Sequence, residues 1–255
     1  MEEQNIKEKE YLINISKVTL PQENPFIIHT ENNKVISVIS RNTSPMKELD
    51  TVSSYRVLYD TVLDLTIKIS YALQKAIEDA YSDEVQHKFD MLHTGGSREW
   101  SAYYNIENAL FRIEALWDIL AQIYNIKYSL EKDIKDVYHS RIFSRKEQWV
   151  KKYWKSGMPD AIGLIANYFT EEDDTEVTDG AWKGNYSYVN SLRNNMTHKF
   201  SISNSELSSY AFELKEHPSY ILKRVTECFS QLQSFIYTAC KNILAEIKDE
   251  KLEKY

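Results

Sequence analysis

Apolar residues recur every three or four positions over most of the chain after residue 44, which is the spacing of one buried face of an α-helix. Four stretches follow this pattern: residues 44–80, 99–126, 181–197 and a last stretch that begins at Pro218. In the second stretch the repeating positions are Tyr103, Ile106, Leu110, Ile113, Trp117, Leu120 and Tyr124. Such spacing favours long helices that pack at shallow angles, so we predict an all-α protein built as an up-and-down helical bundle.

The chain before residue 44 shows a different pattern. Its β-branched residues gather in short stretches that are separated by prolines and by the pair Asn32-Asn33. β-branched residues are enriched in strands, and asparagine tolerates the left-handed conformation of a tight turn. We therefore predict a β-hairpin-like extension over residues 1–43 and a helical bundle over residues 44–255. The expected strands are YLINISKVTL (11–20), PFIIHT (25–30) and KVISVIS (34–40).

Residues 127–180 lie between the second and third helical stretches and are predicted to be a helical insertion. Its segment 141–157 carries six Lys and Arg residues and one Glu, interleaved with Trp149, Tyr153 and Trp154. Aromatic side chains stack on bases while Lys and Arg bind phosphates, so Lys151, Lys152 and Trp154 are candidate RNA-binding residues. The alternative is an amphipathic helix that packs its aromatic residues on the bundle. The acidic end of the insertion, residues 171–180, is expected to be a solvated loop.

Composition and charge exclude several classes of protein. Six glycines and five prolines in 255 residues are far below average usage, which argues against an all-β or disordered chain. The net charge of -7 disfavours nucleic-acid binding over the whole surface but leaves room for a local basic groove. No apolar run approaches the roughly 18 residues of a membrane span, and the charged N-terminus differs from a secretion signal. We therefore expect a cytoplasmic protein with no membrane partner.

The two cysteines do not indicate a disulfide or a metal site. Cys228 and Cys240 stand twelve residues apart in one helical stretch, which places them about 18 Å apart, too far for a disulfide. The chain contains no CxxC, no HExxH and no cluster of Cys and His. We therefore expect no metal and no other cofactor.

A polar cluster stands at the end of the third helical stretch. In SLRNNMTHKF (191–200), Arg193 and His198 form an R-x4-H pattern, and the polar Asn194 follows the arginine directly. On an ideal helix five positions span about 500°, which leaves Arg193 and His198 roughly 140° apart. The two side chains share a site only if the helix ends near Thr197 or if each works with a second copy of the chain. The structural alternative is a histidine that contacts the helix dipole beside an arginine in a surface ion pair.

This pattern resembles that of the HEPN superfamily, whose members are helical bundles with an R-x4–6-H motif and typically a polar residue after the arginine. The polar connection SISNSE and a long last helix follow the motif, which is the usual arrangement in that family. The segment FRIEALWDILAQIYN (111–125) is also similar to the second helix of stand-alone bacterial HEPN proteins. The resemblance covers roughly residues 45–250 and leaves out the N-terminal strands and the insertion.

The resemblance implies a metal-independent endoribonuclease whose active site forms where two motifs meet across a homodimer. The nucleophile is the RNA 2′-hydroxyl, so no metal-bound water is needed. A histidine can move a proton in either direction at neutral pH, and a guanidinium can hold phosphate oxygens and stabilise the charge of the transition state. Arg193, Asn194 and His198 are thus the expected catalytic residues, with Asn194 orienting one of the other two side chains or donating to phosphate.

Such proteins commonly serve as toxins or phage-defence effectors, so the resemblance also names RNA as the substrate and an antitoxin or a nucleotidyltransferase as a candidate partner. The main alternative is a HEPN-fold module without cleavage activity that binds RNA, a nucleotide or a protein partner. A third interpretation is a helical scaffold in which the R-x4-H pattern is accidental.

One further pair of residues has the spacing of a catalytic site. Glu114 and Asp118 stand one helical turn apart in the second helical stretch, where two carboxylates can share acid–base chemistry. A solvated helix face, or an ion pair with Arg112, is the expected arrangement.

Overall fold

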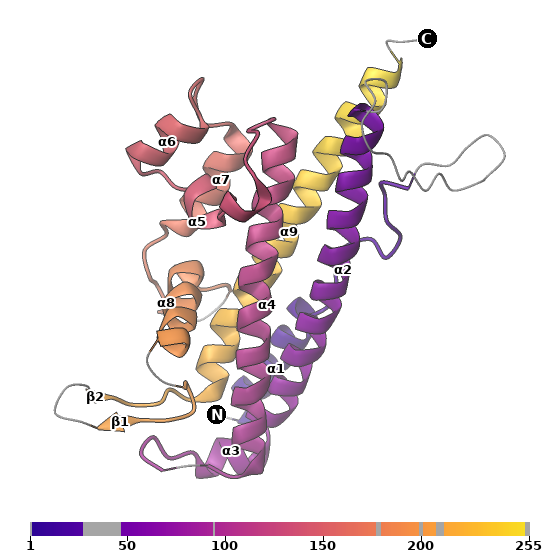
Figure 1. The fold of residues 1–255 in the computed structure, drawn as a ribbon. Helices are drawn as coiled ribbons and strands as arrows, with labels where there is room; N and C mark the ends of the chain where they lie inside the picture. Colours follow the sequence, from indigo (N-terminus) through magenta and orange to yellow (C-terminus); the bar gives the residue numbers. More distant parts are fainter. Residues whose placement is uncertain are drawn as a thin grey trace.

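The computed structural model of the chain describes residues 2–27, 47–93, 95–176, 180–198, 201–207 and 212–252. Three long helices form its centre: α2 (Lys47–Ala80), α4 (Ser97–Lys127) and α9 (Pro218–Leu252). α2 runs antiparallel to α4, whereas α9 runs parallel to α4 (Figure 1). The predicted all-α architecture is confirmed, with the three long helices packed together as a bundle.

Polar contacts fix the two ends of this bundle. The Tyr103 hydroxyl near the start of α4 donates to the Glu216 carbonyl just before α9, at 2.6 Å. At the other end of both helices, Lys127 pairs with Glu246 at 2.7 Å. The two helices therefore remain in register over their full shared length.

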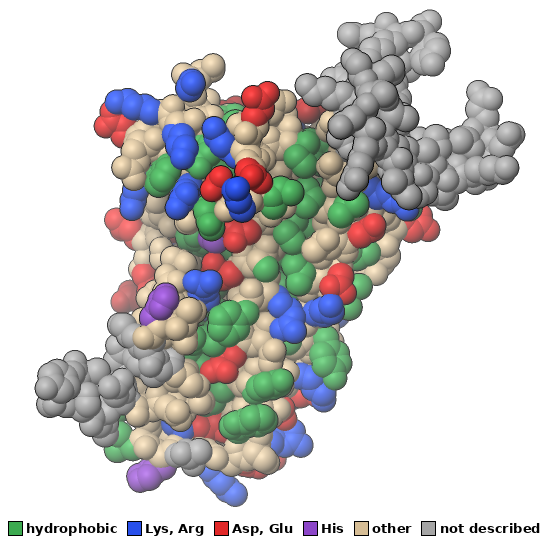
Figure 2. Space-filling model, viewed as in Figure 1, with side chains coloured by type: hydrophobic (Ala, Val, Ile, Leu, Met, Phe, Trp, Pro, Cys, Tyr) green, Lys and Arg blue, Asp and Glu red, His purple; other side chains and the backbone are tan. Residues whose placement is uncertain are grey.

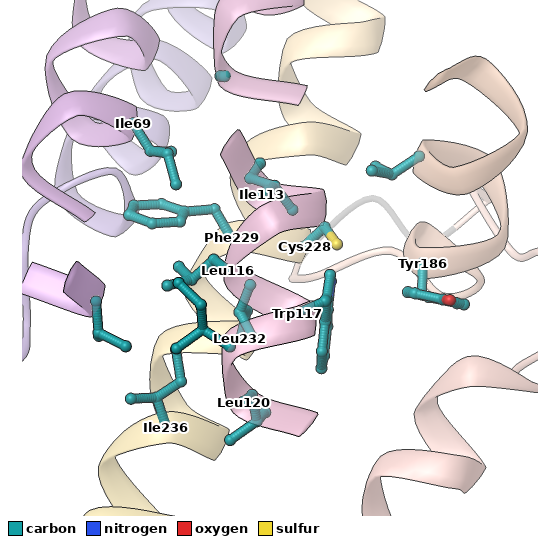
Figure 3. Packing of buried hydrophobic residues seen from close by; sticks show 14 of the residues in the cluster. Ile69, Ile113, Leu116, Trp117, Leu120, Tyr186, Cys228, Phe229, Leu232 and Ile236 are labelled. Carbon is teal, nitrogen blue, oxygen red and sulfur yellow. The ribbon is translucent and has the colours of Figure 1, made fainter. Parts of the chain in front are cut away.

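The core lies between the facing stripes of α2, α4 and α9. The apolar positions predicted on α4, from Tyr103 to Tyr124, are all buried. Figure 3 shows Ile69 of α2, Ile113 of α4 and Phe229 of α9 on the sides where the three helices face one another. Full burial of one large apolar side chain contributes roughly 1.5–3 kcal/mol, so this core is the main source of stability. Further buried core residues are Tyr59, Val62, Leu73, Leu222, Val225, Leu232 and Ile236.

The first expected strand is wrong, because residues 11–15 belong to helix α1 (Glu2–Ile15). The preceding Glu, Gln and Lys residues are strong helix formers, and they extend the helix into the β-branched stretch. Leu12 is fully buried and joins the bundle core, which stabilises this conformation. Residues 16–27 are irregular, and the second expected strand, 25–30, is described only to residue 27, where it forms no strand. The third, 34–40, lies outside the described residues.

The insertion is helical, as predicted, but it is built from short pieces. A 3₁₀ turn (Ile134–Asp136) precedes α5 (His139–Ile142), α6 (Glu147–Tyr153) and α7 (Asp160–Phe169). These helices lie together at one end of the bundle (Figure 1). A further short helix, α3 (Asp83–Lys88), follows α2 and precedes α4 in the sequence.

Helix α8 (Asn185–His198) begins later than the predicted residue 181. Gly184 has φ +72°, and a Cβ at that position would approach the backbone of Asp173 to 2.7 Å. Asp173 lies in the acidic segment and pairs with the fully buried Arg224 of α9 at 2.6 Å. The described part of this segment is thus mostly exposed, as expected, but one of its residues is tied to α9.

A short hairpin occupies the polar connection after α8. β1 (Glu206–Leu207) pairs antiparallel with β2 (Phe212–Glu213). Both cysteines are free and buried on α9, as their spacing predicts. None of the described helices is long and apolar enough to cross a membrane.

Substitution of a core leucine tests the bundle. We expect Leu232→Ala on α9 to lower the free energy of unfolding by about 2–5 kcal/mol, because it leaves a cavity among fully buried neighbours. The matched change Leu164→Ala, at a leucine of α7 that is 62% exposed, is expected to shift it by less than about 0.5 kcal/mol. Urea unfolding of both variants measures the difference, and equal losses would contradict this core assignment.

Candidate functional site

The R-x4-H motif lies on the last two turns of α8. Arg193 is half-buried, while Asn194 and His198 are exposed. Arg193 Nη1 donates to Asn194 Oδ1 at 3.1 Å, a contact that fixes one edge of the guanidinium. The outer edge of Arg193 and the imidazole of His198 are therefore on the surface of α8.

α8 continues through the whole motif. The Thr197 hydroxyl donates to the Arg193 carbonyl at 2.9 Å, and the helix includes His198. Arg193 and His198 consequently stand roughly 140° apart around the helix axis. The structure does not bring the two side chains together within one protomer, so a joint site needs a second copy.

An acidic pair on α4 lies within electrostatic reach of Arg193. Glu114 is only 8% exposed, and Asp118 is half-buried. The expectation of a solvated face is therefore wrong for Glu114, because this side of α4 is covered by the insertion and α8. Arg112 makes no ion pair with either residue; its Nη1 donates to the Asn108 carbonyl at 2.7 Å.

His139, the first residue of α5, lies against both carboxylates. Its Nδ1 is 2.6 Å from Asp118 Oδ1, and its backbone N–H donates to the same oxygen at 3.0 Å. Its Nε2 is 3.6 Å from Glu114 Oε2, which is too long for a hydrogen bond. An ionised carboxylate only accepts hydrogen bonds, so Nδ1 is the donor in this contact.

Burial and nearby charges shift the pKa values of the two carboxyl groups in opposite net directions. Burial raises the pKa of Glu114 above its usual range, although the nearby His139 and Arg193 lower it. Burial also raises the pKa of Asp118, but the hydrogen bonds from the side chain and backbone of His139 lower it by more, so its net pKa is below the usual range. Arg193 acts on both groups, which places its charge within electrostatic reach of the pair.

Three buried polar atoms of Glu114, His139 and Arg193 have no hydrogen-bond partner within the described residues. They are Glu114 Oε1, His139 Nε2 and Arg193 Nε. We refer to Glu114, Asp118, His139 and Arg193 as the α4–α8 cluster. A buried polar atom without a partner destabilises a fold by about 1–3 kcal/mol, so each such atom in a native structure calls for a physical explanation.

Aromatic rings form the wall behind the α4–α8 cluster. Phe169 of α7 stacks on Tyr186 of α8 with ring centroids 3.4 Å apart, and both rings pack edge-on against Trp117 of α4. The His139 ring lies 5.9 Å from the Phe169 centroid. These contacts exclude water from the inner side of the cluster and fix the ring of His139.

The cluster is not arranged as a metal site. No group of three or more His, Cys, Asp or Glu side chains in the described part of the chain could hold a metal ion. Asp118 Oδ1 and His139 Nδ1 contact each other directly, so neither of these two atoms is available to a metal ion. The positive charge of Arg193 instead lies within electrostatic reach of the two carboxylates.

The sequence contained a weak signal for this cluster. The spacing of Glu114 and Asp118 was visible, but the histidine that joins them lies 21 residues beyond Asp118, in a part of the insertion without a motif. The position of His139 depends on how the insertion folds back on α4. Sequence spacing alone does not contain that information.

The predicted RNA-binding residues separate into two groups. Lys151 and Lys152 are exposed on α6, where Lys151 pairs with Glu147 and Lys152 lies 5.4 Å from the Trp149 ring centroid. Figure 2 shows Lys and Arg side chains gathered over the insertion. Both lysines are thus placed where a phosphate can reach them.

The prediction that Trp154 binds RNA is wrong. It is only 5% exposed, and its indole N–H donates to the Ile142 carbonyl at 2.9 Å. Tyr153 beside it is also buried. These rings pack on the bundle, which was the alternative interpretation, so Trp154 cannot stack on a base.

Comparisons with protein-family models, with curated proteins and with solved structures give no match for this chain. The geometry of the described residues is therefore the basis for any assignment of function.

The lowered pKa of Asp118 predicts a pH-dependent loss of stability in Asp118→Asn. An acid whose pKa is depressed in the folded state stabilises the fold above its unfolded pKa, and this contribution disappears as the pH falls through the folded pKa. Since Asp118 is partly exposed, we expect a loss on the order of 1 kcal/mol at pH 7 that shrinks toward pH 3. Urea unfolding across this pH range measures it.

The matched control for this experiment is Asp64→Asn. Asp64 is exposed on α2 and pairs with Lys68 at 2.7 Å, and such surface pairs contribute little. Its substitution is expected to change stability by less than about 0.5 kcal/mol at every pH. A loss for Asp118→Asn that stays constant from pH 7 to pH 3 would be evidence against an ionised Asp118 held by His139.

Proposed function

We propose that this protein is a metal-independent endoribonuclease of the HEPN type that acts as a homodimer. The observation that carries the proposal is the R-x4-H motif on α8. Its arginine is half-buried with two carboxylates within electrostatic reach, and its histidine is exposed at the end of the helix. An arginine held in place and an exposed histidine on the same helix supply the two kinds of group that phosphodiester cleavage needs.

In this reaction the 2′-oxygen of RNA attacks the adjacent phosphorus, and the bond to the 5′-oxygen breaks. His198 takes the proton of the 2′-hydroxyl, and a proton is returned to the leaving 5′-oxygen. Arg193 donates to the phosphate oxygens and stabilises the extra negative charge of the transition state. Asn194, bonded to Arg193, orients the guanidinium toward the phosphate.

A homodimer supplies the combination that one protomer lacks. An exposed aromatic stripe on α4 supports such a dimer: Trp100 is 61% exposed and stacks on Tyr104, and Phe111 follows two turns after Tyr104. Asp118 lies two further turns along the same face. A second copy that covers this stripe would therefore reach the neighbourhood of Arg193.

The basic surface of the insertion gives RNA a binding face. Lys151 and Lys152 are exposed on α6, and Arg145 reaches Asn167 of α7 on the same surface. Phosphate binding by Lys and Arg is independent of sequence, so this surface would hold a single-stranded or looped RNA without reading its bases. The cellular role proposed with this activity is that of a cytoplasmic toxin or phage-defence effector, with an antitoxin or a nucleotidyltransferase as its partner.

Cleavage of labelled, structured RNA in EDTA tests the activity. We expect the wild-type protein to cleave without metal, and Arg193→Ala and His198→Ala each to lower kcat/KM by about 100-fold or more, since one removes the charge stabilisation and the other the proton transfer. Circular dichroism checks that both variants are folded.

The matched control is His87→Ala, at an exposed histidine on α3. This variant is expected to keep the wild-type rate. Cleavage that needs a divalent metal, or that persists in both motif variants, rejects the proposal. A wild-type protein that binds RNA without cleaving it favours the non-catalytic module.

Mixing the two motif variants tests the composite site. If each site takes Arg193 from one protomer and His198 from its partner, a heterodimer of Arg193→Ala and His198→Ala has one intact site. Equal mixing then restores about a quarter of the wild-type activity, because half of the dimers are heterodimers with one of two sites intact. The rate after subunit exchange measures this, and no recovery would argue for a site within one protomer.

A further inference from the structure

We infer that His139 is a positioning residue, supplied by the insertion, that holds Asp118 and Glu114 in place around Arg193. Its effect on catalysis rests on the proposed function, whereas its hold on Arg193 is a property of the fold. The insertion lies outside the resemblance to the HEPN bundle, so nothing in the motif assigns it this role.

The first step is the pair of hydrogen bonds from His139 to Asp118. Two donors of one residue, Nδ1 and the backbone N–H, converge on Asp118 Oδ1 at 2.6 and 3.0 Å. Two hydrogen bonds from one residue fix the position of this carboxylate oxygen. Because the backbone N–H opens α5, the same contact also ties α5 to α4.

The second step is the place of the imidazole between the two acids. Glu114 and Asp118 are one turn apart, and like charges at this spacing repel each other. The imidazole contacts Asp118 through Nδ1 and faces Glu114 through Nε2 at 3.6 Å. It therefore separates two carboxylates that would otherwise move apart or lose a charge by protonation.

The third step links the pair to Arg193. The charge of Arg193 lowers the pKa of both acids, yet Arg193 makes no ion pair within 4.0 Å in the described part of the chain. Its Nε is buried without a hydrogen bond, while Nη1 reaches Asn194. Arg193 therefore has no direct bond to either acid, and the link that we propose is the attraction between its charge and carboxylates whose positions His139 fixes.

His139 itself is not a catalytic residue. It is 6% exposed, its Nδ1 is bonded to Asp118, and the rings of Phe169 and Tyr186 pack against its sides. RNA cannot reach its Nε2. Its contribution must pass through the acids and Arg193, which distinguishes it from the exposed His198.

The test uses the full-length protein and two substitutions at one position. His139→Ala removes the imidazole, while His139→Asn keeps an N–H donor where Nδ1 stands and so retains the bond to Asp118. The first readout is the ¹H–¹⁵N signal of Arg193 Nε, assigned through its loss in Arg193→Lys. The second is RNA cleavage in EDTA, with kcat and KM determined separately. Thermal unfolding checks that each variant is folded.

We expect His139→Ala to shift or broaden the Arg193 Nε signal and to lower kcat by about 10–100-fold, the effect of a small displacement of a catalytic group. KM should stay within about twofold, because the basic face that binds RNA is unchanged. His139→Asn should restore most of the signal and of kcat. The matched control His217→Asn changes a half-buried histidine that bonds Ser219 far from the cluster and should alter neither readout.

A folded His139→Ala variant with an unchanged Arg193 signal overturns the inference. A signal that moves equally in His139→Ala and His139→Asn overturns the role of the Asp118 contact. If the wild-type protein does not cleave RNA, the proposed function fails, and the Arg193 signal alone still decides whether His139 holds the arginine.

Discussion

The burial of the C-terminal half of α4 is the constraint from which the rest of the structure follows. From Leu116 to Tyr124 nearly every residue of this helix is buried, although α2 and α9 can cover only part of its circumference. The insertion and α8 must cover the remainder, and they do so with rings packed around Trp117. Polar groups on a covered helix need partners, so Asn125 bonds the backbone of Lys132 and Asp118 bonds His139. One packing demand therefore creates both the core and the candidate site.

The long helices could be predicted from the sequence because their apolar positions repeat over many turns, so the evidence for each accumulates along the chain. The helix α1 was missed because the residues from Tyr11 to Ile15 favour a strand locally, while the burial of Leu12 against α9 is a tertiary effect. The R-x4-H motif could be identified from the sequence. The burial of Glu114 and the contact of His139 with Asp118 could not, since both depend on where a segment of short helices folds back. Trp154 shows the same limit, because an aromatic side chain suits both a core and a base-stacking surface.

Helix α8 is fixed at its start more firmly than at its end. Gly184 approaches the backbone of Asp173 closely, and Asp173 in turn holds the fully buried Arg224 of α9. A Cβ at position 184 would force these segments apart. The motif end of α8, by contrast, is half-buried: Leu192 and Met196 pack against the core, while Asn194 and His198 are exposed.

The contacts of α1 have a consequence for how the chain is made. The Tyr11 hydroxyl reaches Glu227, and Gln233 bonds both the Thr19 N–H and the Lys17 carbonyl. These partners are 214 to 216 residues apart in sequence. During synthesis α1 leaves the ribosome long before α9, and it cannot dock on α9 until that helix has emerged. The three-helix core must therefore assemble around a helix that arrives late, and contacts of such long sequence separation slow the final step of folding.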